Sequence, residues 1–227
     1  MNCIQAVIFD FDGTLAHLTI DFELLRRKIL ALIEAFICDE EYNAPRIPVL
    51  ELIEAAGEEI EKYEGTDTAL EFKSRSRLVV NATELDAARD GGLFPYTSEL
   101  LIELRNKGIK TGIITRNSTA AVKKVFPDIE AYCDIFIARE DAHAVKPDGK
   151  HLLQALEAVG VEPKHALMIG DHTLDIETGK NAGALCAGVA SGNLNIACLR
   201  ESDPDYVASD CCELIHTLFQ NGTLQPK

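Results

Sequence analysis

Long apolar runs, extended basic stretches and paired-cysteine motifs are missing from this chain of 227 residues, and each absence excludes a class of protein. No apolar run approaches the roughly 20 residues that cross a bilayer. The first residues also lack the charged segment and apolar stretch of a secretory leader. We therefore expect a soluble, cytoplasmic protein with no membrane partner.

Positive charge is scarce in the chain. It has 22 Lys and Arg against 37 Asp and Glu, which gives a formal net charge of −15 at pH 7. DNA, RNA and anionic lipid bind to clustered Lys and Arg, so none of them is expected as a main partner. A small anionic ligand would need a local cationic site.

Metal-binding and disulfide-framework cysteine patterns are also lacking. The cysteines number seven, an odd number, and apart from the adjacent Cys211 and Cys212 they are scattered without a CxxC spacing. We expect reduced thiols, with Cys3, Cys133 and Cys186 in the core because they lie in apolar, strand-like runs. The sequence contains no internal repeat and no low-complexity tract.

The first third of the chain has the pattern of a helical insertion. Apolar residues recur at helical spacing over 21–38, 50–60 and from about 66 towards 89, with Thr66 or Asp67 as a possible cap of the third helix. Glycines bound the region at Gly13 and at 91–92 and could act as hinges. Three consecutive helices without a strand signal predict an all-helical domain placed after the first strand.

After residue 95 the pattern changes to alternating helices and strands. Strands are predicted over 109–115, 133–138, 166–169, 184–189 and 206–207, and helices over 99–107, 120–126, 149–159, 175–181 and 212–219. This alternation is typical of a doubly wound parallel sheet. We therefore predict an α/β core formed by residues 1–15 and 95–227, with a helical domain over 16–94.

Two acids follow the first predicted strand directly. The predicted strand is a short run rich in β-branched residues, formed by Ile4, Val7, Ile8 and Phe9. Asp10, Asp12 and Gly13 come next. Ligands of open α/β sheets bind at the carboxyl ends of the strands. Neighbouring carboxylates can take different protonation states, and they offer hard oxygen ligands to Mg²⁺. The alternative is an acidic turn without a function.

Three more polar clusters follow later strands. Thr115, Arg116 and Asn117 end the strand 109–115, where a hydroxyl and exposed backbone amides just before a helix could bind phosphate. Asn117 or Ser118 could instead merely cap the next helix. Lys146, beside a proline, could hold a phosphate or lie in a solvated turn.

The last cluster is Gly170, Asp171 and Asp175. The spacing of the two acids places both carboxylates on one face of a starting helix, although acids there also serve as caps. All four clusters fall at the same end of different strands. One fold could therefore bring them to a single crevice.

These motifs resemble those of the haloacid dehalogenase superfamily. The run from Asp10 to Leu15, DFDGTL, looks like its first motif, Thr115 its second, Lys146 its third, and Gly170–Asp171 with Asp175 its fourth. The resemblance covers the whole chain and implies a Rossmann-like core with an inserted helical cap.

The resemblance implies a role for each motif residue. Asp10 would be the nucleophile that forms an aspartyl-phosphate, and Asp12 the general acid and base. Mg²⁺ would be held by Asp10, by the main-chain carbonyl of Asp12 and by Asp171, with assistance from Asp175. The presence of Asp12 favours phosphoryl transfer over dehalogenation.

The phosphoryl oxygens would be bound by the other motif residues. These are Thr115, the amide of Arg116, Asn117 and Lys146. Cations and hydrogen-bond donors are needed there because an anionic nucleophile meets an anionic phosphate.

The substrate is expected to be a small phosphorylated metabolite. The chain is similar to phosphoglycolate phosphatases, so we expect a phosphatase that hydrolyses a small monoester, phosphoglycolate-like or a sugar phosphate. A mutase of the β-phosphoglucomutase kind and a non-catalytic phosphate-binding domain are the alternatives. Candidate specificity residues are His17, Lys73, Arg75 and Arg77, although a solvated hinge histidine and a solvated helix face are the more common explanations of such residues. The protein is expected to be a monomer or a homodimer.

Overall fold

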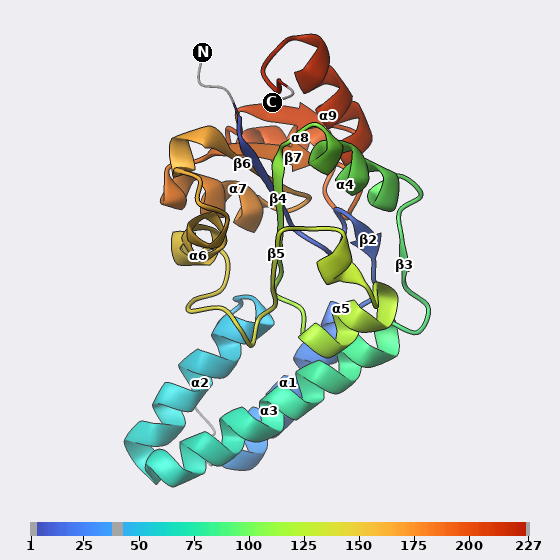
Figure 1. Ribbon diagram of the computed structural model, residues 1–227. Helices are drawn as coiled ribbons and strands as arrows, with labels where there is room; N and C mark the ends of the chain where they lie inside the picture. The colour runs from blue at the N-terminus through green and yellow to red at the C-terminus, as the bar shows by residue number, and fades with distance from the viewer. Residues whose placement is uncertain (1–3, 38–42, 226–227) are drawn as a thin grey trace. The chain divides into compact units, whose positions relative to one another are not determined.

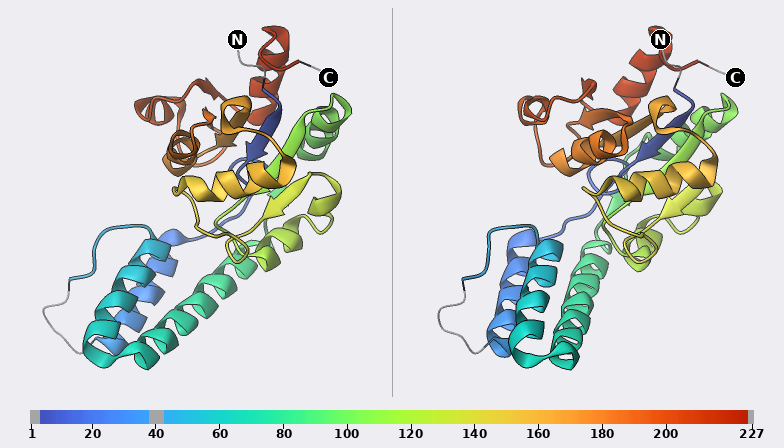
Figure 2. Two further views of the ribbon diagram at one scale, coloured as in Figure 1. Left: turned by 60° about the vertical axis from the view of Figure 1, so that its left-hand side comes forward. Right: turned by 90° about the vertical axis from the view of Figure 1, so that its left-hand side faces the viewer.

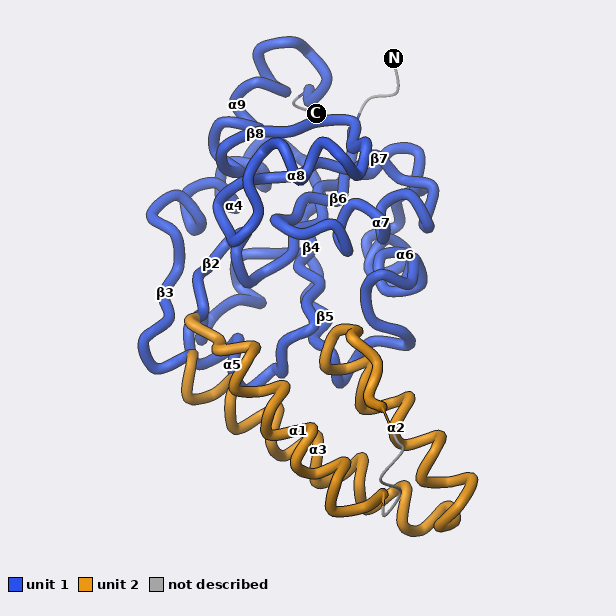
Figure 3. The backbone as a smooth tube through the Cα atoms, turned by 180° about the vertical axis from the view of Figure 1, so that it is seen from behind, with its two compact units in different colours: residues 1–18, 88–227 blue, residues 19–87 orange. Residues whose placement is uncertain are grey.

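The computed structural model describes residues 4–37 and 43–225. The chain folds into two compact units. Residues 1–18 and 88–227 form the first, and residues 19–87 form the second, as Figure 3 shows in two colours. The first unit is called the core unit below, and the second the helical unit.

The core unit is built on a sheet of six strands in the order β5-β4-β1-β6-β7-β8 (Figure 1). Every neighbouring pair is parallel. The strands are β1 (Ala6–Phe9), β4 (Lys110–Ile114), β5 (Ile135–Ile137), β6 (Ala166–Gly170), β7 (Leu185–Val189) and β8 (Tyr206–Ala208). The parallel, doubly wound fold predicted from the sequence is confirmed.

The central strand β1 is the most enclosed part of this sheet. All four of its residues are buried, as a continuous apolar run between two parallel neighbours requires. Phe9 pairs with Ile113 of β4 and with Ile169 of β6. The segments that follow these three strands therefore leave the sheet at one edge.

Helices connect the strands of the core unit. They are α4 (Thr97–Asn106), α5 (Thr119–Val125), α6 (Gly149–Val159), α7 (Thr173–Ala182), α8 (Ile196–Glu201) and α9 (Cys211–Gln220). Helix α6 packs on the sheet through Leu152 and Leu156, which share one apolar cluster with Ile8 and Met168. Burying a side chain of this size stabilises the fold by about 1.5–3 kcal/mol.

The helical unit consists of α1 (Phe22–Phe36), α2 (Val49–Glu64) and α3 (Thr66–Ala87), which lie side by side in Figure 2. The predicted helical insertion after the first strand is confirmed. Asp21 caps α1 by accepting a hydrogen bond from the amide of Leu24. The apolar stripes of the three helices meet in a core that contains Ile29, Leu52 and Phe72.

Some expectations need correction. Thr66 and Asp67 both lie inside the first turn of α3, so neither is the residue before that helix. Two short strands were not predicted, β2 (Ala16–His17) and β3 (Gly92–Leu93), and they pair antiparallel with each other. Two-residue strands carry too little periodicity to be recognised in a sequence. The helix α8 was also missed.

The structure also bears on the cysteine and membrane expectations. Cys133 and Cys186 are buried free thiols, as predicted, whereas Cys3 lies outside the described residues. Within 4–37 and 43–225, no helix combines the length and the apolar character that crossing a membrane requires.

Candidate active site

Three carboxylates meet at the carboxyl edge of the sheet. Asp10 follows β1, Asp171 follows β6, and Asp175 lies in the first turn of α7. One oxygen from each lies within 4.8 Å of the others, and all three side chains are buried. Asp171 and Asp175 lie 161 and 165 positions after Asp10 in the chain. The parallel pairing of β1 with β6 brings the three acids together.

Lys146 is the cation that contacts this cluster. Its Nζ lies 2.5 Å from Asp10 Oδ1 and 2.6 Å from Asp175 Oδ1, and the residue is only 3% exposed. The peptide bond between Lys146 and Pro147 is cis. Buried charges require partners of the opposite sign, and here one ammonium group serves two carboxylates.

The carboxylates are nevertheless short of positive charge. Burial raises the pKa of Asp10 to about 6, against the opposing attraction of Lys146. Burial, with repulsion from Asp10 and Asp175, raises the pKa of Asp171 to about 8. Burial alone would lower the pKa of Lys146, but attraction by Asp10 and Asp175 raises it overall. The site therefore favours one more cation.

Glycines leave room for these acids. A Cβ on Gly13 would lie 2.3 Å from Asp171 Oδ2, one on Gly192 would lie 1.8 Å from the same atom, and one on Gly170 would lie 2.1 Å from Asp175 Cγ. Three buried carboxylates in such a glycine-lined space form a set of hard oxygen donors. Asp10, Asp171 and Asp175 therefore fit a divalent cation by their chemistry, and they could hold one.

Asp12 lies in the turn that follows β1. Its Oδ1 accepts a hydrogen bond of 2.7 Å from the amide of Leu18, which orients the carboxylate. Repulsion by its charge contributes to the raised pKa of Asp171. Gly13 next to it has φ +83°, a backbone conformation that a residue with a Cβ adopts only with strain.

The residues after β4 form a compact turn. Thr115 is buried, and its Oγ1 donates to Asn117 Oδ1 at 2.9 Å and accepts from the Asn117 amide at 3.1 Å. Arg116 donates from its guanidinium to the carbonyl of Lys146 at 3.0 Å. Of the two helix caps considered, Ser118 is the observed one, since its side chain accepts from the amide of Ala121.

The last motif differs in one detail from the expectation. Asp171 lies before α7 and not on it, because the helix is capped by His172 and begins at Thr173. The two acids therefore approach each other across a turn and do not share a helix face. Asp175 combines both predicted possibilities, since its Oδ2 accepts from the capping amide while its Oδ1 pairs with Lys146.

The four candidate specificity residues are divided between the two units. His17 belongs to β2 of the core unit, where its exposed ring lies 6.0 Å from that of Phe94. The other three lie on α3 of the helical unit. Lys73 pairs with Glu54 and Arg75 with Glu71, while Arg77 is exposed. Their role in specificity stays a prediction.

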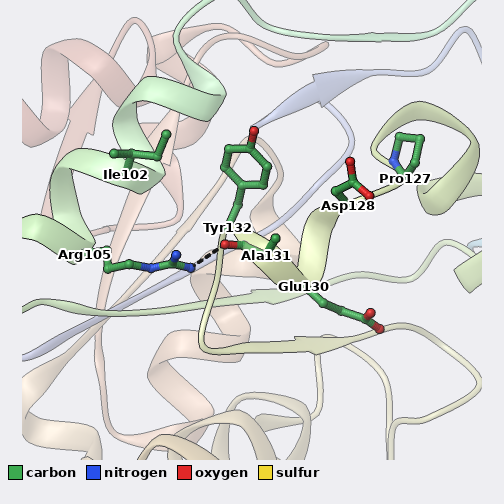
Figure 4. A pocket seen from close by; sticks show the side chains of 7 residues that line it. All are labelled: Ile102, Arg105, Pro127, Asp128, Glu130, Ala131 and Tyr132. Carbon is green, nitrogen blue, oxygen red and sulfur yellow. Dashed lines mark hydrogen bonds between the residues drawn. The ribbon is translucent and has the colours of Figure 1, made fainter.

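A surface cavity elsewhere in the core unit has a volume of about 490 Å³ (Figure 4). Arg105, Asp128 and Tyr132 are among the residues lining it, and Arg105 donates to the carbonyl of Ala131. None of the residues predicted for chemistry lines this cavity. The buried acids, rather than this hollow, are thus the candidate site.

One segment at the site was missed in the sequence. Ser191 and Gly192 follow β7, and Ser191 Oγ donates to the carbonyl of Gly13 at 2.7 Å. Gly192 borders the Asp171 carboxylate. The signal was present, because a Ser-Gly pair follows a predicted strand at the same edge of the sheet.

Comparison with known proteins identifies the family. The model of the haloacid dehalogenase-like hydrolases matches residues 4–183. A Clostridium perfringens protein provisionally named pyrophosphatase PpaX is 32% identical over 218 residues, which is 93% of this chain and 96% of that protein. The pyrophosphatase PpaX of Oceanobacillus iheyensis is 27% identical and covers 93% and 95%.

A solved structure shares the fold. A Haemophilus somnus protein described as a predicted phosphoglycolate phosphatase superposes with a TM-score of 0.63 at 20% identity, covering 94% of this chain and 97% of that one. At such low identity the likeness concerns the fold alone.

Proposed function

We propose that this chain, which belongs to the haloacid dehalogenase-like hydrolases, is a Mg²⁺-dependent phosphatase that transfers a phosphoryl group to water through Asp10. The observation that carries the proposal is the buried group of Asp10, Asp171 and Asp175 with Lys146 paired to two of its members. A binding module for phosphate alone has no need for so many acids around an anion.

In this proposal Asp10 is the nucleophile. A carboxylate oxygen attacks phosphorus, the bond from phosphorus to the leaving oxygen breaks, and the phosphoryl group remains on Asp10 as an acyl phosphate. The pKa of about 6 leaves Asp10 mostly ionised at neutral pH, as an attacking group must be. Water then attacks the phosphorus, which releases inorganic phosphate and restores the carboxylate.

Asp12 moves the protons. It gives a proton to the leaving oxygen in the first step and takes one from the attacking water in the second, so its protonation state is restored after each turnover. The hydrogen bond from the Leu18 amide to Oδ1 orients the carboxylate for this task.

Positive charge and donors complete the site. Asp10, Asp171, Asp175 and the main-chain carbonyl of Asp12 would hold Mg²⁺, which when bound offsets the repulsion between the acids and the phosphate. Lys146 supplies a second positive charge beside Asp10. Thr115, Arg116 and Asn117, in the turn after β4, would donate to the phosphoryl oxygens.

A small phosphate monoester is the proposed substrate, and pyrophosphate is the second candidate because the relatives at 32% and 27% identity carry the name pyrophosphatase. The two substrates differ in their leaving group. An alkoxide is a stronger base than a phosphate and needs the proton of Asp12 more. Loss of Asp12 should therefore slow monoester hydrolysis more than pyrophosphate hydrolysis.

The test is phosphate release from pyrophosphate, phosphoglycolate and several sugar phosphates, with Mg²⁺ or with EDTA. We expect Mg²⁺-dependent release with the wild-type protein, and none above background with Asp10→Asn, whose circular dichroism should stay unchanged. Isomerisation of a sugar phosphate without net release would favour a mutase. Retained turnover by Asp10→Asn would reject the proposed nucleophile.

A further inference from the structure

The turn that carries Asp12 leaves three carbonyl groups for partners outside itself. Within the turn, the amide of Gly13 donates to the carbonyl of Ala16, and the amides of Thr14, Leu15 and Ala16 all donate to the carbonyl of Phe11. The carbonyls of Gly13, Thr14 and Leu15 accept instead from distant segments. Buried carbonyl groups need such partners, since leaving one unpaired destabilises the fold.

Three side chains supply donors to the first two of these carbonyls. Ser191 Oγ donates to Gly13 at 2.7 Å, Tyr96 Oη donates to Thr14 at 2.9 Å, and Cys211 Sγ donates to Thr14 at 3.5 Å. They lie 178, 82 and 197 positions away from their acceptors. We call Tyr96, Ser191 and Cys211 the carbonyl clamp.

Neighbouring contacts hold Tyr96 of the clamp in place. The ring of Tyr96 stacks on Phe94 at a centroid distance of 5.6 Å. The next residue, Thr97, is buried and donates to the carbonyl of Leu15 at 2.5 Å. Burial raises the pKa of Tyr96, so its hydroxyl stays protonated and can donate at any working pH.

The clamp also connects the turn to the carboxylate cluster. Ser191 precedes Gly192, which borders the Asp171 carboxylate, and Thr14 Oγ1 donates to Asp171 Oδ1 at 3.4 Å. The same turn carries Asp12 between Phe11 and Gly13. A shift of the turn would therefore move Asp12 relative to the acids that would hold the cation.

We propose that Tyr96 and Ser191 are positioning residues for the proton-transfer role of Asp12, an inference that rests on the proposed function. Each hydroxyl fixes one carbonyl of the turn, and Cys211 supports the same carbonyl as Tyr96. Losing one neutral hydrogen bond removes only a small part of the stability of a fold, so both variants should still fold. A displacement of about 1 Å at a reacting group can cost about 100-fold in rate.

The test uses Tyr96→Phe and Ser191→Ala, with Ser191→Thr as the conservative variant. Tyr132→Phe is the matched control, since it removes a tyrosine hydroxyl from the surface cavity of Figure 4. Hydrolysis of an alkyl phosphate, with its basic leaving group, is compared with that of p-nitrophenyl phosphate, whose leaving group needs little protonation.

We expect Tyr96→Phe and Ser191→Ala to lower kcat for the alkyl phosphate about tenfold, with KM within twofold, and to lower kcat for p-nitrophenyl phosphate much less. Ser191→Thr should recover most of the loss, and Tyr132→Phe should match the wild type. Unchanged kcat in both variants, or an equal loss with both substrates, would overturn the inference, because a purely structural role does not distinguish leaving groups.

A second measurement is independent of activity. The amides of residues 14–16 should exchange hydrogen faster in Tyr96→Phe and Ser191→Ala than in the wild type. The amides of β4 should stay protected in all three proteins. Unchanged exchange in the turn would refute the clamp, whatever the enzyme does. If instead the turn loosens but Asp10→Asn retains full activity, the proposed function fails and the positioning of the turn stands.

Discussion

Replacing Lys146 by methionine removes the ammonium group from a buried position while keeping most of the side-chain volume. The variant leaves Asp10 and Asp175 without the partner that lies 2.5 and 2.6 Å from them. Both acids are buried, so water cannot replace that partner at low cost. We expect the metal-free protein to be strongly destabilised at pH 8.

The size of the effect follows from the burial of the pair. Removing one partner of a buried ion pair typically costs about 3–5 kcal/mol, because the other charge is left uncompensated. Part of that cost is avoided when the remaining acid takes up a proton. Since the pKa of Asp10 is already about 6, the acid is protonated more readily at pH 5. The loss should therefore be smaller at pH 5 than at pH 8.

Urea unfolding followed by circular dichroism measures the loss as a difference in the free energy of unfolding. The comparison requires that the slope of this free energy against urea concentration is the same in both proteins. Lys150→Met is the matched control, because Lys150 is an exposed lysine near the start of α6, and such surface changes usually stay within about 0.5 kcal/mol. If Lys146→Met were as stable as Lys150→Met at pH 8, the ion pairs would not hold the site together.

Three further perturbations test other parts of the molecule. First, the pKa of Asp171 is raised to about 8, so the stability contributed by its protonated form is lost as pH rises through 8. Calorimetric Tm should therefore rise more on Mg²⁺ addition at pH 8.5 than at pH 6.5, and an equal rise at both would contradict the shift. Second, burial lowers the pKa of His151 to about 3. The folded protein therefore keeps this imidazole neutral, and its free energy of unfolding falls as pH drops below about 6.5. His151→Leu should gain stability relative to the wild type from pH 6.5 to 4, by urea unfolding, and a pH-independent difference would argue against it. Third, Gly192→Ala would place a Cβ 1.8 Å from Asp171 Oδ2, whereas Gly92→Ala meets nothing closer than 3.5 Å. Mg²⁺-dependent turnover should fall at least tenfold in the first variant only, and equal activity would show that the carboxylate has room to move.

The centre of the sheet was predictable because the strands β1 and β6 are buried on both faces. Val7 to Phe9 and the strand β6 are continuous apolar runs that end at polar residues, which is a strong signal in one sequence. Helix α8 was missed because six residues span fewer than two turns, and its one clear marker is the cap at Asn195.

The grouping of the acids in the candidate site was predictable, because their residue type marks them in the sequence. Asp10 and Asp171 directly follow β1 and β6, and Lys146 lies in the loop between β5 and α6. The parallel fold brings the segments that follow its strands together. Tyr96 and Cys211 could not be found in this way. They act on the backbone carbonyl of Thr14, and a carbonyl is the same at every position, so no residue pattern marks its partner.

The proposed chemistry depends on one cation shared by Asp10, Asp171 and Asp175. Calorimetric titration of the metal-free protein with Mg²⁺ tests this directly. We expect one ion per wild-type chain, binding weakened at least tenfold in Asp171→Asn, and unchanged binding in Asp128→Asn, whose carboxylate lines the surface cavity. Wild-type affinity in Asp171→Asn would contradict the shared site.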